Sequence, residues 1–120
     1  MRSLIGYWLA SKNYTDREDV PRNEEPENVE GAVQIRYDIL ERNKEVYTNA
    51  TTSKKYSFII ECSFKDTIDV HDLIYVQNEW YEVERVNEKL PKEKQAIVKA
   101  WPGLYERHAV KVVYLEWWKI

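Results

Sequence analysis

The sequence contains few of the residues from which small proteins build chemical sites. Its 120 residues include one cysteine, two histidines and three glycines. A single cysteine excludes an internal disulfide, and Cys62 lies in an apolar run that favours a buried structural thiol. The three glycines are far apart and form no phosphate-binding loop. His71 and His108 have no partners at metal-ligand spacing. We therefore expect no enzyme, no catalytic residue, no metal and no cofactor.

A small polar cluster surrounds His71. Asp69 and Asp72 flank His71 just before an apolar run. The cluster could indicate a metal or acid–base site, but short polar residues ahead of a strand are typical of a capped turn. We predict a turn.

Long apolar runs are also missing. The stretch Leu4 to Ala10 is too short to span a membrane, and no basic leader with a cleavage site precedes it. We expect neither secretion nor membrane insertion, and a reducing compartment of synthesis fits the single thiol.

Charge is nearly balanced, with a formal net charge of −3. Residues 11–31 hold seven acidic residues against three basic ones, so this segment accounts for the acidity. It also contains Pro21 and Pro26 and few apolar residues, which predicts a long acidic loop outside the core. The remainder lacks the strong basic excess of proteins that hold nucleic acid through its phosphates.

From Ala32 onward the sequence alternates apolar and polar residues as strands do. Val33, Ile35, Tyr37 and Ile39 recur at a spacing of two, which places them on one face of a strand. Short runs of this kind predict an all-β fold, a small barrel or sandwich in one domain of residues 1–120, with at most a minor helix. The expected strands are residues 4–9, 32–40, 46–48, 56–64, 68–76, 80–86, 95–101 and 109–120, with a polar turn at 41–45 and a helical turn or strand start at 104–108.

The last of these strands is apolar on both faces. A small domain can usually cover only one face with its own core, so the other face is a candidate subunit interface. The residues predicted for that interface are Val113, Leu115, Trp117 and Trp118.

The chain is rich in aromatic residues, with five tryptophans and nine tyrosines. Stacked on a sheet, they could bind single-stranded nucleic acid, as in oligonucleotide-binding barrels. The tryptophans lie in apolar strand patterns and are not interleaved with lysine and arginine, which favours the core or a protein interface.

Residues 68–86 predict a β-hairpin turning at Gln77, Asn78 and Glu79. An Ile and an Asp lead into a D-x-I-x-x strand, and a Y-x-V-x-x-V strand follows the turn. This pattern resembles the hairpin of the small head-to-tail joining proteins of tailed bacteriophages, the connector or stopper subunits below the portal. Asn78 stands where that family commonly has glycine, and asparagine adopts a positive φ more readily than most residues. The resemblance covers residues 56–100.

The resemblance implies a virion structural protein, made in the bacterial cytoplasm and located in the neck. Such a subunit forms a homo-oligomeric ring between portal or adaptor and tail proteins and helps retain packaged double-stranded DNA through loose channel contact, away from any membrane. The resemblance assigns no particular loop to the channel. Our first candidate for a DNA- or portal-facing loop carries Lys89, Lys92 and Lys94. The alternatives are a tail terminator or similar phage ring protein, and an oligonucleotide-binding barrel.

Overall fold

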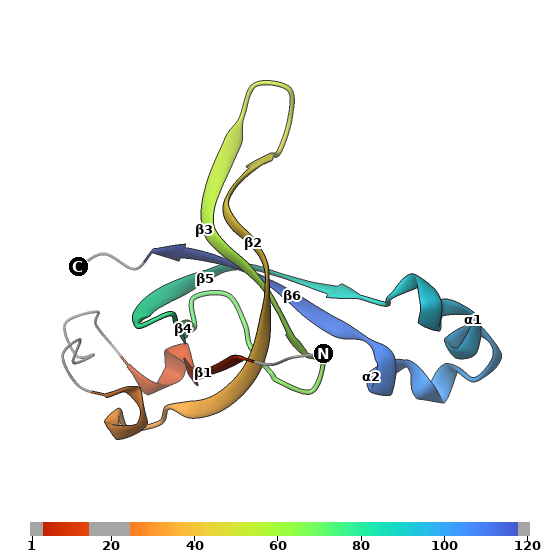
Figure 1. Cartoon of the computed structure of the whole chain (residues 1–120), viewed down its shortest axis with the longest axis horizontal. Coiled ribbons are helices and arrows are strands. Elements are labelled where there is room, and N and C mark those ends of the chain that lie inside the picture. Colours follow the sequence, from red (N-terminus) through yellow and green to blue (C-terminus); the bar gives the residue numbers. More distant parts are fainter. Residues whose placement is uncertain (1–3, 15–24, 118–120) are drawn as a thin grey trace.

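The chain folds around a closed antiparallel β-barrel, seen in Figure 1. The structure is a computed structural model that describes residues 4–14 and 25–117. The six strands of this part of the chain follow the order β1-β2-β3-β6-β5-β4, and pairing of β4 with β1 closes the barrel. The predicted all-β class is confirmed. The strands are β1 (Leu4–Leu9), β2 (Val33–Tyr47), β3 (Ser53–Ser63), β4 (Leu73–Val76), β5 (Glu79–Lys89) and β6 (Val110–Trp117).

Helices occupy two of the connections between strands. The 3-10 helices η1 (Ser11–Asn13) and η3 (Pro26–Asn28) lie between β1 and β2. Between β5 and β6 the chain forms α1 (Lys92–Ala100), η4 (Pro102–Leu104) and α2 (Tyr105–His108). Two short α-helices therefore accompany the barrel, consistent with the prediction of an all-β fold with a minor helix.

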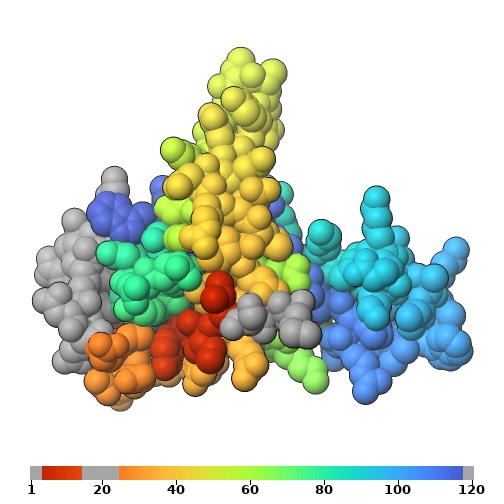
Figure 2. Space-filling model, viewed as in Figure 1, coloured from red at the N-terminus to blue at the C-terminus, as the bar shows by residue number. Residues whose placement is uncertain are grey.

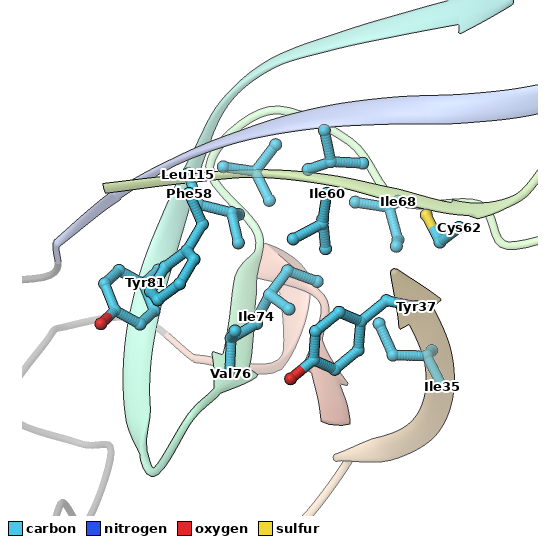
Figure 3. Packing of buried hydrophobic residues seen from close by; sticks show 12 residues of the cluster. Ile35, Tyr37, Phe58, Ile60, Cys62, Ile68, Ile74, Val76, Tyr81 and Leu115 are labelled. Atoms are coloured by element: carbon cyan, nitrogen blue, oxygen red, sulfur yellow. The ribbon is translucent and has the colours of Figure 1, made fainter. Parts of the chain in front are cut away.

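The barrel interior is filled by side chains that alternate along the strands, as the pleat of a β-strand requires. Figure 3 shows their packing. Tyr37 and Ile60 are almost completely buried, and the Phe58 and Tyr81 rings meet edge to face with centroids 5.1 Å apart. Cys62 lies in this core, as its apolar context predicted. The cluster comprises Ile35, Tyr37, Phe58, Ile60, Cys62, Ile68, Ile74, Val76, Tyr81, Val83, Val113 and Leu115.

A second apolar cluster lies beneath the connection between β1 and β2. Leu9, Val29, Leu73 and Trp80 are buried there, and Pro26 at the start of η3 is buried nearby. The predicted acidic loop, residues 11–31, therefore contributes to the core through its described end. Residues 15–24 of that loop lie outside the described part.

Two of the predicted elements are wrong: the turn at 41–45 and the strand at 95–101. The polar run 41–45, predicted as a turn, continues β2 as one strand with a register shift between Ile39 and Glu41. These residues are polar because both faces of the strand are exposed here. The turn comes later, at residues 48–52. Predicted strand 95–101 is the helix α1, which Pro91 precedes and Pro102-Gly103 follows. Its lysines, glutamate, glutamine and alanines are good helix formers, so local propensity prevailed over the apolar residues.

The predicted hairpin is confirmed, with shifted limits. Its first strand begins at Leu73, and Asp69 to Asp72 form the approach to it. Gln77 and Asn78 turn the chain with φ of 50° and 70°, the left-handed pair of a two-residue hairpin turn.

Two parts of the chain extend away from the barrel (Figures 1 and 2). We call residues 43–57 of the β2–β3 ribbon the arm, which rises at the top of both figures. Pairing of β6 with β3 stops at Phe58 and pairing of β1 with β2 stops at Tyr37, so the arm has two strands only. We call residues 90–108, which contain α1, η4 and α2, the helical lobe; it lies at the right.

Candidate assembly surfaces

The structure places the predicted interface residues of the last strand in different environments. Val113 and Leu115 are completely buried in the barrel core, so they cannot contact a neighbouring subunit, and that prediction is wrong for both. Trp117, at the end of β6, keeps 43% of its surface exposed. Trp118 lies outside the described residues.

The outer face of β6 is covered by the chain itself, which explains the correction. Tyr56 and Ile59 of β3 pack with Val112 in a third buried cluster. The Tyr56 ring meets the Tyr114 ring edge to face at 5.1 Å, and the Arg85 guanidinium lies 5.2 Å from the Tyr114 ring centre. The sequence correctly indicated two covered faces but not that the base of the arm supplies the second cover.

The three lysines predicted to share a loop belong to two regular elements. Lys89 is the last residue of β5, whereas Lys92 and Lys94 lie in the first turn of α1. Their loop was expected to join two strands, but the connection contains the helical lobe. These lysines are therefore at the base of that lobe, where β5 enters it.

The tip of the arm is an uncharged polar loop. Asn49 Oδ1 accepts hydrogen bonds from the backbone N–H of Thr51 at 2.9 Å and of Thr52 at 2.8 Å. The Thr48 N–H donates to the Thr52 carbonyl at 2.9 Å. Residues 47–53 carry no charge, and Tyr47 is 66% exposed. A two-stranded ribbon has little stability of its own in water, so these bonds and the contacts at its base hold it in shape.

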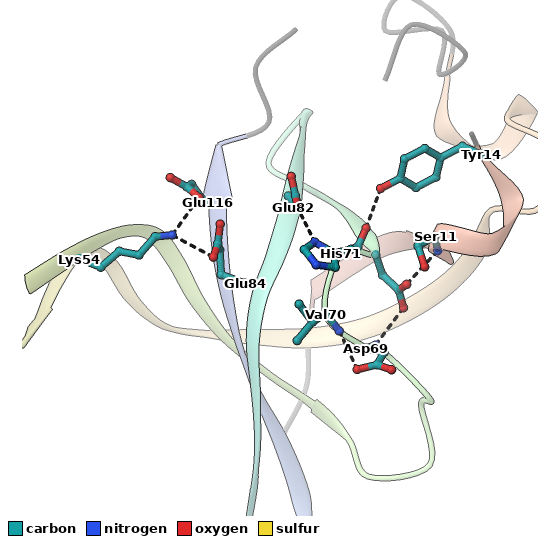
Figure 4. A network of polar contacts seen from close by, with 10 residues as sticks. Ser11, Tyr14, Lys54, Asp69, Val70, His71, Glu82, Glu84 and Glu116 are labelled. Atoms are coloured by element: carbon teal, nitrogen blue, oxygen red, sulfur yellow. Dashed lines mark hydrogen bonds and ion pairs between the residues drawn. The ribbon is translucent and has the colours of Figure 1, made fainter. Parts of the chain in front are cut away.

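A lysine fastens the arm to the barrel, as Figure 4 shows. Lys54 Nζ lies 2.9 Å from Glu84 Oε2 on β5 and 3.3 Å from Glu116 Oε2 on β6. Glu82 of β5 pairs with Glu116 of β6, and the register of the two strands shifts between Val83 and Arg85. This shift leaves Glu84 beside that pair. Three carboxylates thus share one patch of the outer surface.

The electrostatics of this patch follow from that crowding. A hydrogen bond with the Glu84 carboxylate raises the pKa of Glu116, and burial adds to the rise. The same hydrogen bond with Glu116 and that with Lys54 lower the pKa of Glu84. The pKa of Lys54 is raised, chiefly by its hydrogen bond to Glu84. Glu84 is therefore the anionic partner of Lys54, and Glu116 is the carboxyl that takes up a proton first.

A cleft of about 460 Å³ lies over this patch, between the arm and the end of the β5–β6 ribbon. Its walls combine acidic, polar and aromatic side chains. They are Asn43, Lys55, Ser57, Glu82, Glu84, Glu116 and Trp117. We call this the acidic cleft.

The helical lobe carries the most exposed tryptophan of the described chain. Trp101 is 65% exposed and Ile97, one turn earlier, is 37% exposed, whereas Val98 is the one buried residue of α1. A shallow apolar depression of about 570 Å³ is lined by consecutive residues 100–104. The lobe is joined to the barrel through Tyr105, which donates to Glu88 Oε2 at 3.2 Å and stacks edge-on with Phe64 at 5.5 Å. Pro102-Gly103 after a helix-forming run was the sequence signal for this lobe.

Asp72 organises the predicted turn around His71, also drawn in Figure 4. Its buried carboxylate accepts hydrogen bonds from Trp8 Nε1 at 2.8 Å and from the backbone N–H of Ser11 at 2.8 Å and Asp69 at 2.9 Å. His71 has a φ of 75°, is exposed, and its Nδ1 lies 3.1 Å from Glu82 Oε2. Asp72 thus ties the ends of β1 and β4 together, and the predicted capped turn is confirmed.

Two kinds of feature are missing from the described residues: a metal-binding cluster and a helix that could cross a membrane. Within residues 4–14 and 25–117 no group of three histidine, cysteine or acidic side chains could hold a metal ion. No helix in this part of the chain has the length and apolarity needed to cross a membrane. The surfaces that stand out are the arm, the acidic cleft and the helical lobe. Comparison of the chain with protein-family models, with curated proteins and with solved structures found no match.

Proposed function

We propose that this protein is a structural subunit that assembles as a ring at the head-to-tail junction of a tailed bacteriophage. The observation that carries the proposal is a closed barrel with two projections whose surfaces differ in kind: a polar arm and an apolar-tipped helical lobe. A ring subunit needs one surface for its neighbours and another for what passes through the ring. The resemblance of the β4–β5 hairpin to the joining proteins supports the same class.

The arm suits the bore of such a ring. Its tip has no charge, and residues 43–57 together hold three lysines against one glutamate, a weak positive excess. DNA that has to slide past must not be held by many phosphate contacts, since each adds to affinity. In this proposal the arm replaces the segment around Lys89, Lys92 and Lys94 as the element next to DNA.

The helical lobe suits a protein contact. Exposed tryptophan is enriched where proteins bind one another, because its large surface gives strong contact at low entropic cost. Trp101 and Ile97 present such a surface on the helical lobe. The lobe lies at the opposite end of the β5–β6 ribbon from the place where Lys54 fastens the arm.

An oligonucleotide-binding barrel fits less well. Trp80 is buried, Trp8 is hydrogen-bonded to Asp72, and the exposed aromatics Tyr47, Trp101 and Trp117 lie on three different elements. A single strand needs successive aromatic platforms along one basic groove.

The proposal is tested by adding purified protein to DNA-filled heads that carry a portal but lack a tail. We expect electron microscopy to show an additional ring below the portal and the heads to retain DNA that otherwise leaks. Heads that gain no density and leak at an unchanged rate would count against the proposal. A salt-sensitive shift of a labelled oligonucleotide at micromolar protein would favour the nucleic-acid barrel instead.

A further inference from the structure

The acidic cleft and the helical lobe lie at opposite ends of the same β5–β6 ribbon. Glu82 pairs with Glu116 at the cleft, and Lys89 pairs with Val110 where the ribbon enters the lobe. At about 3.3 Å per residue, the chain rises roughly 20 Å between these two positions. One molecule therefore cannot place its own lobe in its own cleft.

The two surfaces are complementary in charge. Residues 90–108 hold four basic residues against two glutamates, and Lys99 and Arg107 are exposed near Trp101. The cleft is lined by three glutamates and one lysine, and acids still exceed bases when Lys54 is counted. Glu116 is crowded beside Glu84, which raises its pKa, so a further cation placed here would stabilise its ionised form.

The two surfaces also match in apolar content and size. Trp101 is the exposed apolar side chain of the lobe, and Trp117 presents a half-exposed indole at the cleft. A cleft of about 460 Å³ falls within the range of roughly 300–1,000 Å³ that accommodates small molecules, so one aromatic side chain fits.

We propose that the helical lobe of one copy docks in the acidic cleft of the next copy, with Trp101 against Trp117 and Lys99 or Arg107 facing Glu82 and Glu116. The partner is a second copy of this chain, and the inference rests on the proposed ring function. A contact between two different patches at opposite ends of a subunit is heterologous, and it closes into a ring when the rotation between copies divides a full turn.

The first experiment measures self-association of the whole chain by sedimentation velocity. We expect Trp101→Ala to raise the dissociation constant roughly 10- to 100-fold, as loss of a central aromatic contact does. Tyr47→Ala is the matched control, because Tyr47 is equally exposed but lies on the arm, and it should leave association unchanged within about twofold. Near-ultraviolet circular dichroism checks that both variants keep the fold. A second lobe variant, Ile97→Glu, should behave like Trp101→Ala.

The second experiment tests the direction of the contact by disulfide trapping. Cys62 is buried, so cysteines introduced by Ala100→Cys and Asn43→Cys are the reactive ones, and substitution of the exposed Ala100 leaves the neighbouring Trp101 in place. We expect the double variant to form a ladder of oxidised oligomers and each single variant to remain uncrosslinked. A mixture of the two single variants should stop at the dimer, because it offers only one compatible pair of cysteines.

Four outcomes would overturn the inference. Association that Trp101→Ala leaves intact, or a symmetric dimer from Ala100→Cys alone, would remove the proposed contact while the ring function stands. Trapping of Ala100→Cys on portal protein in assembled heads would assign the lobe to the portal and likewise spare the ring. Absence of any self-association at millimolar concentration would contradict both the contact and the ring function.

Discussion

Trp8 donates its indole Nε1–H to the Asp72 carboxylate at 2.8 Å, across a sequence separation of 64 residues. The same carboxylate accepts the backbone N–H groups of Ser11 and Asp69. Asp72 is only 3% exposed, so its carboxylate depends on these three donors for hydrogen bonds. This one side chain holds together the start of the barrel and the approach to its central hairpin.

Replacing Asp72 should therefore be costly. We expect Asp72→Ala to lower the free energy of unfolding by about 3 kcal/mol, roughly 1 kcal/mol for each donor left without an acceptor. Asp69→Ala is the matched control, because the Asp69 carboxylate accepts from Val70 N–H at an exposed position, and it should cost less than about 1 kcal/mol. Urea unfolding measures both. Equal losses would show that the Asp72 network does not stabilise the fold as described.

Glu116 should reduce stability at neutral pH. Its folded-state pKa is raised above 4.5, chiefly by Glu84, so its favourable contribution exists below pH 4.5 and is lost as the pH rises through the folded pKa. We expect Glu116→Gln to stabilise the protein at pH 7 by about 0.5 kcal/mol, a small value because solvent screens a side chain that is 45% exposed. The gain should vanish near pH 3, where the wild-type carboxyl is also neutral.

Glu84 should have the opposite effect on stability from Glu116. Its pKa is lowered, so its contribution is present above pH 4.5 and is lost as the pH falls. Glu84→Gln removes the anion that Lys54 pairs with and should lower stability at pH 7 by up to about 1 kcal/mol, less in high salt. Urea unfolding of both variants at pH 7 and pH 3 measures the difference. A Glu84→Gln protein that is more stable than wild type at pH 7 would reverse the assignment of the two carboxyls.

The β4–β5 turn can be improved. Gln77 and Asn78 both have positive φ, and glutamine adopts that conformation less readily than asparagine or glycine. Gln77→Asn should raise the free energy of unfolding by about 0.5–1 kcal/mol, and Asn78→Gly should be neutral or stabilising. Gln77→Val, which is β-branched, should be destabilising. Thermal unfolding ranks the three variants, and a stabilising valine would contradict the left-handed turn.

Gly6 is required by a close approach between strands. A Cβ at this position would press on the carbonyl oxygen of Tyr75 and lie 2.9 Å from Tyr37 Cε1. Since β1 is held between β2 and β4, we expect Gly6→Ala to cost about 2–3 kcal/mol. Gly103→Ala is the control, because nothing lies within 4 Å of a Cβ there, and it should change stability by less than about 0.5 kcal/mol. Similar stability of the two variants would disprove the close packing at Gly6.

The fold class followed from side-chain periodicity, but the projections did not. Alternation at Ile35 and Tyr37 identified a buried strand face directly, because these side chains line the core. The same prediction is wrong for Val33, which is 52% exposed at the start of β2. That signal fades in β2 beyond Leu40, where the ribbon is exposed on both faces, so continued strand looked like a turn. In α1 a single buried residue, Val98, left no helical stripe to detect.

The assembly residues were harder to predict than the fold. Alternation correctly separated the two faces of β6 but could not show that the chain covers both. Val113 and Leu115 face the barrel core, and Tyr56 and Ile59, far away in sequence, pack against the outer face. The sequence favoured the core or a protein interface for Trp101, and it is the position of α1, which ends just before it, that leaves Trp101 exposed. The clustering of Glu82, Glu84 and Glu116 depends on strand register and a bulge, neither of which a single sequence determines.

The position of β6 between β3 and β5 has a consequence for how a newly made chain matures. During translation β3 emerges long before β6, and until then the edge of β3 that β6 will occupy stays unpaired. Pairing across such a sequence separation is slow compared with local hairpins. Glu116 of β6 forms part of the cleft wall, so in the proposed assembly the acidic cleft is complete only after β6 has paired with β5.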